Sequence, residues 1–328
     1  MATVALRKVS KVYEQDRAAP AGGRAAALDD VTLDIAEGEI CVLMGLSGCG
    51  KSTLLRLLNG LVTPTDGQVL VDGDDLGTLS HRRLQQLRRG TMAMVFQSFA
   101  LFPHRTVIDN AAFGLEIAGV AKPERLRRSG AVLEQVGLGG HGAQYPHQLS
   151  GGMRQRVGLA RALAVNPSLL LMDEAFSALD PLTRRGMQDL LLSLQKEQRR
   201  TIVFVSHDID EALHLGDRIA MLHDGRLLQH GAPRAFLTQP AHDHVRAFFQ
   251  GVDPARHLRA ADLIDPVAPP SDATTAGVAA DTTLGDLLSR LGQLTAPLTV
   301  RDASGVALGA ITAASALRVL TRARGSHA

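Results

Sequence analysis

A glycine-rich segment, GLSGCGKST at residues 45–53, constrains the fold of this chain more than any other feature. It lies between the apolar run EICVLM and a helical pattern that starts at Lys51. A strand, a glycine loop and a helix in this order are the context that the pattern G-x-x-x-x-G-K-[ST] requires. We expect the helix to end near Gly60, because glycine is favoured just past a helix end. This unit predicts an α/β fold with a parallel sheet.

Each residue type in this loop has a physical task. Glycines let backbone N–H groups turn toward phosphate oxygens, and the helix start adds partial positive charge. Lys51 is expected to reach the β- and γ-phosphates, and the Ser52 hydroxyl to ligate Mg²⁺. The loop therefore predicts a nucleotide site formed by Gly45, Ser47, Gly48, Cys49, Gly50, Lys51, Ser52 and Thr53.

Composition limits the class of protein. Lys and Arg (35) nearly balance Asp and Glu (33), so the net charge of +2 lacks the basic excess of a typical nucleic-acid binder. Apolar runs are too short for a membrane span, and we expect a chain that does not cross a membrane unaided. Cys41 and Cys49 show no disulfide or metal pattern, which favours a reducing, cytosolic setting. Cys49, beside Lys51, is either a reactive thiol or a small residue tolerated in a tight loop.

Strand and helix patterns extend the α/β core along the chain. Apolar runs at 168–173 and 201–207 predict buried strands, each followed by a helical pattern. Residues 3–13 and 26–36 predict an antiparallel β-layer. Between about 98 and 165 the pattern is mostly helical, which predicts an α-helical insertion. Two later apolar runs flank Asp224-Gly225 and predict a hairpin.

Two adjacent carboxylates, Asp173 and Glu174, end the first of these buried strands. Ligands of open α/β sheets bind at the carboxyl ends of the strands. Side chains of adjacent residues point to opposite sides, so Asp173 is expected to address the metal and Glu174 the attacking water. The alternative is an ordinary acidic turn after a strand.

A second glycine motif, LSGGMRQRV at 149–157, is called here the signature segment. Ser150 suits a helix N-cap, but capping alone does not explain Gly151 and Gly152. Paired glycines at a helix start allow close approach of an anion to the backbone. The loop at Lys51 already wraps one side of a triphosphate, so we predict that the signature segment serves a second copy of the chain.

These motifs together resemble the ATPase subunits of ABC transporters over roughly residues 3–250. The resemblance rests on residues 45–53, MVFQS, the signature segment, LLLMDE, SALD and FVSHD, in the order and spacing of that family. It implies a P-loop NTPase core of ABC type, and two subunits that pack head to tail around two ATP molecules with Mg²⁺.

The resemblance also assigns roles to single residues. Tyr13 corresponds to the aromatic residue that stacks on adenine, with strand capping as the alternative. Gln97 corresponds to a metal and water contact that senses the membrane partner, and Glu174 to the general base. His207 corresponds to the switch residue on the γ-phosphate, and Asp180 lies in the loop that crosses the dimer interface. The implied catalytic set is Glu174, His207, Lys51 and Gln97; the metal set is Ser52, Gln97 and Asp173.

Longer stretches, including YPHQLSGGMRQRVGLARALAVNPSLLLMDEAFSALDPLTRRGMQ, resemble the subgroup that serves glycine betaine and choline importers. This implies a peripheral ATPase on the cytoplasmic face of a bacterial inner membrane. Its partners would be permease subunits and, indirectly, a substrate-binding protein, but no nucleic acid. Phe99, Phe102 and Pro103 correspond to the segment that grips a permease helix, with core packing as the alternative. Importers of methionine, polyamines or another compatible solute remain the alternative.

Two other classes of function fit the sequence less well. Cytosolic ABC proteins that act on DNA or ribosomes insert long coiled coils between the two glycine motifs or carry two cassettes. Only about a hundred residues separate Lys51 from Ser150, without sustained heptads. A sensor with incidental hydrolysis is disfavoured by the intact Glu174 and His207.

The composition shifts toward Ala, Asp, Pro and Thr near residue 252, which predicts a domain boundary. We expect an ATPase domain at 1–251, a linker or degenerate CBS remnant at 252–276 and a CBS-like region at 277–328. The last region has a strand-helix-strand-strand-helix pattern that resembles one CBS module. A Ser at 315, where that family has Asp three residues after the Thr, disfavours nucleotide binding and favours a dimerisation or vestigial role.

Overall fold

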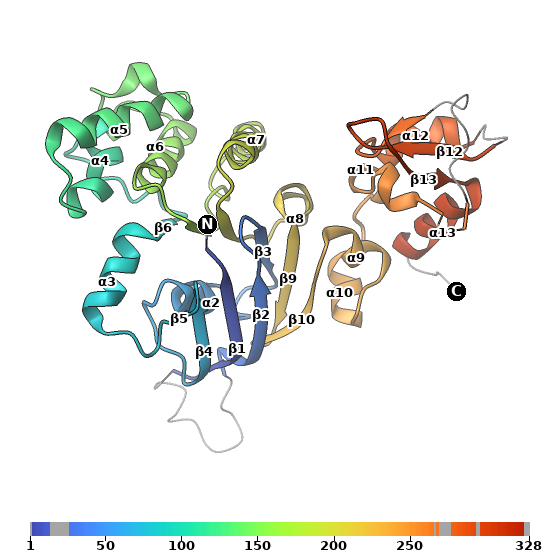
Figure 1. Ribbon diagram of the computed structural model, residues 1–328, viewed down its shortest axis with the longest axis horizontal. Coiled ribbons are helices and arrows are strands. Elements are labelled where there is room, and N and C mark those ends of the chain that lie inside the picture. The colour runs from blue at the N-terminus through green and yellow to red at the C-terminus, as the bar shows by residue number, and fades with distance from the viewer. Residues whose placement is uncertain (1, 14–25, 266, 269–276, 293–295, 325–328) are drawn as a thin grey trace. The chain divides into compact units, whose positions relative to one another are not determined.

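The computed structural model describes residues 2–13, 26–265, 267–268, 277–292 and 296–324. The chain divides into two compact units, residues 1–230 and 231–328 (Figure 1). The first unit contains both glycine motifs and the carboxylate pair. Among the described residues, no helix is both long and apolar enough to cross a bilayer.

The predicted antiparallel layer is confirmed. Its strand order is β2-β1-β4-β5, and β1 pairs antiparallel with both β2 and β4. Alternate residues of β2 are buried, which gives one core face and one exposed face. The strands of this layer are β1 Val4–Lys11, β2 Leu28–Ile35, β4 Asp66–Val71 and β5 Asp74–Asp75.

The predicted parallel sheet is also confirmed. Its order is β10-β9-β3-β8-β7-β6, with β3 parallel to β8 and β9, and β7 parallel to β8 and β6. Every residue of β3 and β8 is buried, as expected for central strands covered on both faces. The strands are β3 Ile40–Met44, β6 Met92–Val95, β7 Leu169–Asp173, β8 Thr201–Val205, β9 Arg218–His223 and β10 Arg226–Gly231.

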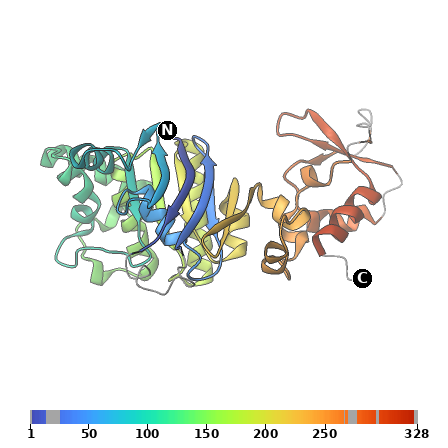
Figure 2. The same cartoon turned by 90° about the horizontal axis from the view of Figure 1, so that it is seen from below.

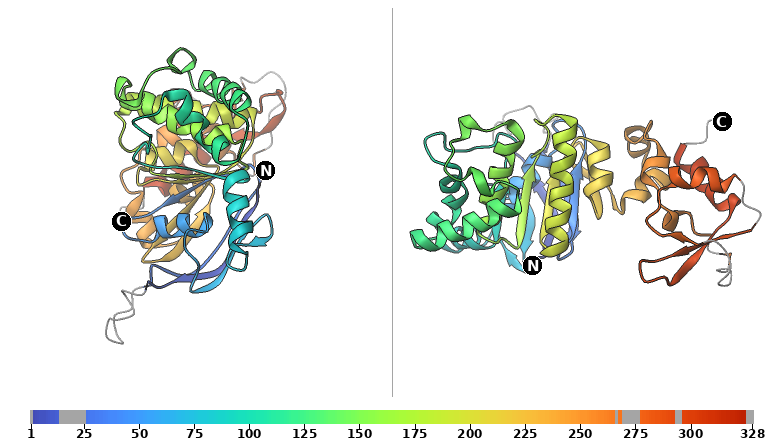
Figure 3. Two further views of the ribbon diagram at one scale, coloured as in Figure 1. Left: turned by 90° about the vertical axis from the view of Figure 1, so that its left-hand side faces the viewer. Right: turned by 90° about the horizontal axis from the view of Figure 1, so that it is seen from above.

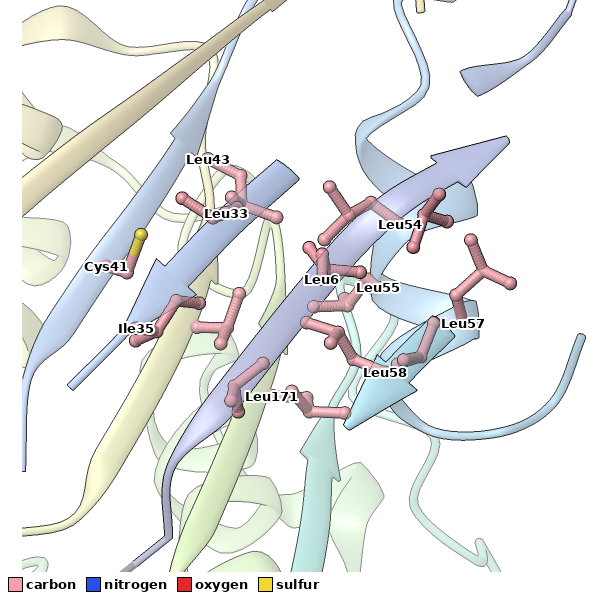
Figure 4. Close-up of a cluster of buried hydrophobic side chains, with 14 of the residues drawn as sticks. Leu6, Leu33, Ile35, Cys41, Leu43, Leu54, Leu55, Leu57, Leu58 and Leu171 are labelled. Atoms are coloured by element: carbon pink, nitrogen blue, oxygen red, sulfur yellow. The ribbon is translucent and has the colours of Figure 1, made fainter. Parts of the chain in front are cut away.

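Helix α2 (Lys51–Leu58) lies between the two sheets. It contacts β4 on one side and β7 and β8 on the other. Its leucines, including Leu54 and Leu58, join Leu6 and Leu171 in one buried cluster (Figure 4). The Phe176 and Phe204 rings pack 5.4 Å apart, and α7 (Pro181–Glu197) contacts α8 (Ile209–Leu215), which in turn contacts β3. The glycine loop therefore joins two elements that are both held rigidly by the core.

The predicted helical insertion is confirmed and forms a group of mutually packed helices (Figures 1 and 3). Helix α4 contacts both α5 and α6. Thr106 and Ser150 cap α4 and α6 by accepting hydrogen bonds from backbone N–H groups in the first turn. The elements are α4 Val107–Ile117, α5 Lys122–Gln135, η1 Gly139–His141, η2 Pro146–Gln148 and α6 Gly151–Ala164.

Strands β4 and β6 and helix α3 (His81–Gly90) were not predicted from the sequence. Two signals were present: Val69 and Val71 alternate with less buried residues, and Ser80 accepts a hydrogen bond from the Arg83 N–H as an N-cap. The hairpin turn at Asp224-Gly225 is confirmed, because both residues have positive φ, 46° and 77°.

The second unit begins at residue 231, whereas composition placed the boundary near 252. Residues 231–251 group with the tail because α9 contacts α13. The second unit contains a sheet of order β11-β12-β13 (Figure 2). From β11 onward, the elements of this unit follow the predicted strand-helix-strand-strand-helix order. Its elements are α9 Pro233–Thr238, α10 Asp243–Phe248, α11 Pro254–His257, η3 Ala260–Leu263, β11 Val278–Ala279, α12 Leu284–Leu291, β12 Leu298–Arg301, β13 Ala307–Ile311 and α13 Ala313–Arg324.

Candidate active site

The glycine loop requires glycine at positions 45 and 50, because backbone atoms of other segments lie very close to both residues. Gly45 has φ of 140°, and a Cβ there would lie 2.2 Å from the Leu222 carbonyl oxygen. Gly50 has φ of 103°, and a Cβ there would lie 2.4 Å from the Ala27 carbonyl oxygen. Any other residue would displace the backbone, so the shape of the loop depends on these two positions.

Lys51 lies at the base of the loop and is only 7% exposed. Its ammonium group donates to the carbonyl oxygens of Gly45, at 2.7 Å, and Leu46, at 2.9 Å. The Cys49 sulfur lies 3.8 Å from the same ammonium. A pocket of about 300 Å³ opens beside it, large enough for the phosphates of a nucleotide. Its lining consists of Ala27, Ser47, Gly48, Gly50, Lys51, Ser52, Thr53, Glu174 and His207.

The carboxylate pair lies at the carboxyl end of β7, as predicted. Burial and the charge of Glu174 raise the pKa of Asp173, while Arg56, Lys51 and a hydrogen bond from Ser52 oppose that rise. Ser52 and Asp173, two of the three expected metal ligands, are therefore in contact. A hydroxyl and a carboxylate are donors that Mg²⁺ prefers, so these residues fit the ion.

Glu174 has an unusual backbone conformation. Its φ of 45° lies in the left-handed region, which costs a non-glycine residue about 1–3 kcal/mol and is most common at functional sites. Its side chain is 28% exposed, and Oε1 lies 3.6 Å from Nδ1 of His207. Both side chains line the pocket beside Lys51. The structure thus brings together three of the four residues expected to act in catalysis.

Gln97, the fourth, does not line this pocket. Its Nε2 donates to Oγ of Ser177 at 3.2 Å, and Ser177 Oγ donates to the Glu174 carbonyl oxygen at 2.9 Å. Gln97 therefore reaches Glu174 through Ser177, a residue that sequence reasoning passed over. The signal was its place three residues after Glu174, where a hydroxyl can bond back to the turn.

Arg184, in the first turns of α7, was also missed. Its guanidinium lies 3.1 Å from the Asp208 carboxylate and donates to the carbonyl oxygens of Ser177, at 3.3 Å, and Leu179, at 3.1 Å. Asp208 caps α8 and directly follows His207. One side chain thus ties the segment after Glu174 to the segment that carries His207. No local pattern reveals this contact, because its partners are far apart in sequence.

Tyr13 lies beside the glycine loop. Its hydroxyl is 3.3 Å from Oγ1 of Thr53, and the Lys11 ammonium lies 5.3 Å from the centre of its ring. The residue is half-buried and comes after the end of β1. Its ring is thus held next to the nucleotide pocket, although it is not part of the lining.

The signature segment lies outside the pocket. Ser150 is exposed and accepts a hydrogen bond from the Met153 N–H at 3.3 Å, so it caps α6. A Cβ on Gly152 would lie 2.5 Å from Cγ2 of Thr183, whereas one on Gly151 would meet nothing within 4 Å. Asp180 is an N-cap too: it accepts from the Thr183 N–H at 3.1 Å, and its hydrogen bonds with Thr183 lower its pKa.

Comparisons with known proteins agree with these features. A family model described as ABC transporter matches residues 28–177. The glycine betaine/proline betaine transport system ATP-binding protein ProV of Salmonella typhimurium is 54% identical over 259 residues, 79% of this chain and 65% of that protein. The trimethylamine N-oxide transport system ATP-binding protein TmoW of Ruegeria pomeroyi is 50% identical over 74% of this chain and 72% of its own. The methionine import ATP-binding protein MetN of Caulobacter vibrioides is 46% identical over 75% and 71%.

A solved structure of the dimeric bacterial ABC transporter cassette MJ0796 matches with a TM-score of 0.62 at 36% identity. The match covers 70% of this chain and 98% of that cassette. This chain spans between 58% and 65% of the length of four betaine-transport relatives. Sequence, fold and the geometry around Lys51 therefore agree: this chain belongs to the family of ABC transporter ATP-binding proteins.

Proposed function

We propose that this protein is the ATP-hydrolysing subunit of an importer, and that it hydrolyses ATP only as a head-to-tail pair. The observation that carries the proposal is the division of the site. Lys51, Glu174 and His207 line one pocket, while the signature segment, in which Ser150 is exposed, contributes nothing to its lining. A helix start that carries two glycines is suited to an anion, and a second copy would bring its own phosphates there.

The chain's own groups suit phosphoryl transfer to water. The Lys51 ammonium, now shared between two carbonyl oxygens, would move to the β- and γ-phosphates. Ser52 and Asp173 would hold Mg²⁺, which when bound neutralises developing charge on the phosphates. Glu174 would orient the attacking water and accept its proton. His207, 61% exposed, is free to turn toward the γ-phosphate.

Tyr13 is proposed to stack on the adenine. Its hydroxyl contact with Thr53 fixes the ring near the start of α2, where the nucleotide phosphates would bind. The remaining loop residues, Gly45, Ser47, Gly48, Cys49 and Gly50, would present backbone N–H groups to those phosphates.

A permease helix is the proposed partner of the groove between the sheet and the helical insertion. A cavity of about 220 Å³ there is lined by Met92, Met94, Phe113 and Ile117, among others, and Ile117 is 49% exposed. Phe102 packs against Phe113 with ring centres 4.6 Å apart and the ring planes tilted by 58°, and it is half-buried. It therefore packs beside the groove and supports the wall that a helix would contact.

The transported solute is proposed to be a quaternary amine such as glycine betaine or choline. The support is the group of relatives named for betaine transport, at 50–57% identity. A different solute is the alternative, because a relative named for methionine import is 46% identical to this chain. The solute would be selected by a permease and a binding protein, with this subunit peripheral on the cytoplasmic face of the inner membrane.

The CBS-like tail is proposed to serve dimerisation, not nucleotide sensing. Thr312 donates to the Asp265 carboxylate at 3.0 Å, and Arg318 lies 3.6 Å from the same carboxylate. Ser315 is buried and donates to the Leu263 carbonyl oxygen at 2.7 Å. The polar groups that a ribose would need are thus engaged within the tail.

The proposed head-to-tail dimer can be tested by measuring the ATPase rate per subunit against protein concentration. Glu174→Gln serves as the variant that traps the ATP-bound dimer. We expect the specific rate to rise with concentration, and the variant to elute as a dimer with ATP and as a monomer without it. Cys41→Ser, a small change remote from the pocket, serves as the control. A specific rate independent of concentration in a monomeric sample would refute the division of the site. Solute identity requires reconstitution with a permease and competing amines.

A further inference from the structure

A mixed cluster of polar side chains lies at the amino end of β3, opposite the glycine loop. Glu39 precedes β3, Cys41 lies within it, and His230 lies in β10. A carboxylate oxygen, the sulfur and a ring nitrogen of these residues all lie within 4.8 Å of one another. Figure 4 shows Cys41 at the edge of the buried cluster, next to Ile35. Nothing in the ATPase mechanism uses these three side chains.

Each of the three groups offers one donor atom to the cluster. Glu39 Oε2 accepts from the Ala36 N–H at 3.0 Å, while Oε1 is buried and accepts no hydrogen bond. The Cys41 thiol is fully buried. Burial, and then the charge of Arg218, lower the pKa of His230 to about 4, so its ring is neutral near pH 7. Neutral imidazole is the form that binds metals.

A cation already lies among these groups. The Arg218 Nε donates to Nε2 of His230 at 3.1 Å and lies 3.9 Å from Glu39 Oε1. Arg218 is next to Cys41 on the neighbouring strand, so the side chains share one face of the sheet. The Arg218 side chain is 44% exposed and can withdraw into solvent. The Nε2 lone pair of His230, which Arg218 now contacts, would then face the donor atoms of Glu39 and Cys41.

We propose that Glu39, Cys41 and His230 bind a thiophilic divalent cation such as Zn²⁺, in exchange with the guanidinium of Arg218. Carboxylate, thiolate and imidazole are all zinc ligands, and three of them leave a fourth position for water. Bonds of ~2.0–2.3 Å place tetrahedral donors about 3.5 Å apart, so the separations of up to 4.8 Å shorten by about 1.3 Å at most on binding. His230, next to the end of a two-stranded hairpin, is the ligand best able to move.

Binding is accompanied by release of one proton. The Cys41 thiol becomes a thiolate when its sulfur bonds to the metal, and its proton passes to solvent. Two anionic ligands then neutralise the dication, so Arg218 is no longer needed as the local positive charge. Arg218 and the metal therefore compete for the same donor atoms. A merely structural ion pair would not show this competition.

The site is remote from catalysis. From Cys41 to Gly45 the strand rises four residues, about 13 Å at ~3.3 Å per residue. The metal would therefore stabilise the fold by mass action and leave ATP binding unchanged.

The two cysteines provide a matched control. Untagged full-length protein, free of nucleotide, is titrated with Co²⁺ and then Zn²⁺, and the thiolate-to-cobalt charge-transfer absorption is monitored. We expect one equivalent with this band in wild type and in Cys49→Ser, and loss of the band in Cys41→Ser. His230→Gln should weaken binding at least about tenfold, and Arg218→Met should strengthen it because the competing cation is gone. Thermal unfolding of each metal-free variant, and ATP titration of every variant except Cys49→Ser, confirm that the variants fold.

The opposite results would overturn the proposal. A wild-type protein without the band, or a band lost in Cys49→Ser and kept in Cys41→Ser, places no metal at this cluster. A band that is unchanged in His230→Gln, or weakened in Arg218→Met, contradicts the ligand set and the exchange. Zn²⁺ should also raise the unfolding midpoint of wild type but not of Cys41→Ser, and equal shifts in both would count against the site.

Discussion

The replacement Arg184→Met tests whether one side chain couples the two halves of the catalytic pocket. Methionine keeps an unbranched apolar stem but removes all three contacts, to the Asp208 carboxylate and to the carbonyl oxygens of Ser177 and Leu179. Asp208 still caps α8 through its bond from the Glu211 N–H, so the helix itself remains. The variant loses the link between the segment after Glu174 and the segment of His207.

The contacts set the magnitude of the effect. A hydrogen bond to a charged group contributes about 1.5–3 kcal/mol when well shielded. Arg184 and Asp208 are 26% and 34% exposed, so water replaces part of the loss. We expect the free energy of unfolding to fall by about 2–3 kcal/mol in total. Misplacing reacting groups by about 1 Å reduces turnover on the order of 100-fold, so kcat should fall between about 10- and 100-fold.

Urea unfolding and steady-state ATPase kinetics measure both effects. KM for ATP should stay close to wild type, because Arg184 does not line the pocket. Arg185→Met is the matched control: its side chain is 58% exposed and lies 3.6 Å from an equally exposed Asp189. Such a surface pair contributes at most about 1 kcal/mol, so the control should change little. If Arg184→Met matches Arg185→Met in stability and kcat, the coupling role is wrong.

Three further changes have definite outcomes. Ser177→Ala removes the hydroxyl between Gln97 and the Glu174 carbonyl; kcat should fall about tenfold while ATP affinity by nucleotide titration is unchanged, and a weakened affinity would contradict this. Burial raises the pKa of Glu211 above its usual 4.5, so the contribution of Glu211 to stability is fully present below that value and is lost as pH rises through the raised pKa. Glu211→Gln should remove this part of the pH dependence in unfolding titrations, whereas a parallel pH curve would count against it. Lys51→Ala should weaken ATP binding itself, and equal affinity would show that the ammonium makes no phosphate contact.

Elements with strong local periodicity were predictable from the sequence. The buried strands β3, β7 and β8 are short apolar runs, and the glycine loop determines that a helix begins directly after β3. Elements with weaker signals were missed: β6 is only four residues long, and α3 is largely polar. Short or polar elements depend on the neighbours that they pair with, which no local pattern records.

The candidate site divides in the same way. Lys51, Glu174 and His207 belong to sequence motifs, and the structure brings them into one pocket. Ser177 and Arg184 act through tertiary contacts, so their roles emerge only when distant segments are placed together. The boundary near 252 and the CBS-like assignment of the tail stay predictions.

By itself, the sequence determined the local chemistry: which residues suit a phosphate, which carboxylates end a strand, and which glycines lie between a strand and a helix. These features are local, since backbone conformation and residue type decide them within a few residues. Only the tertiary structure decided which groups share a space. Gln97 reaches Glu174 through Ser177, and Glu39, Cys41 and His230 converge across 191 residues, 39 to 230, because the order of strands in a sheet is set by packing and not by position in the chain.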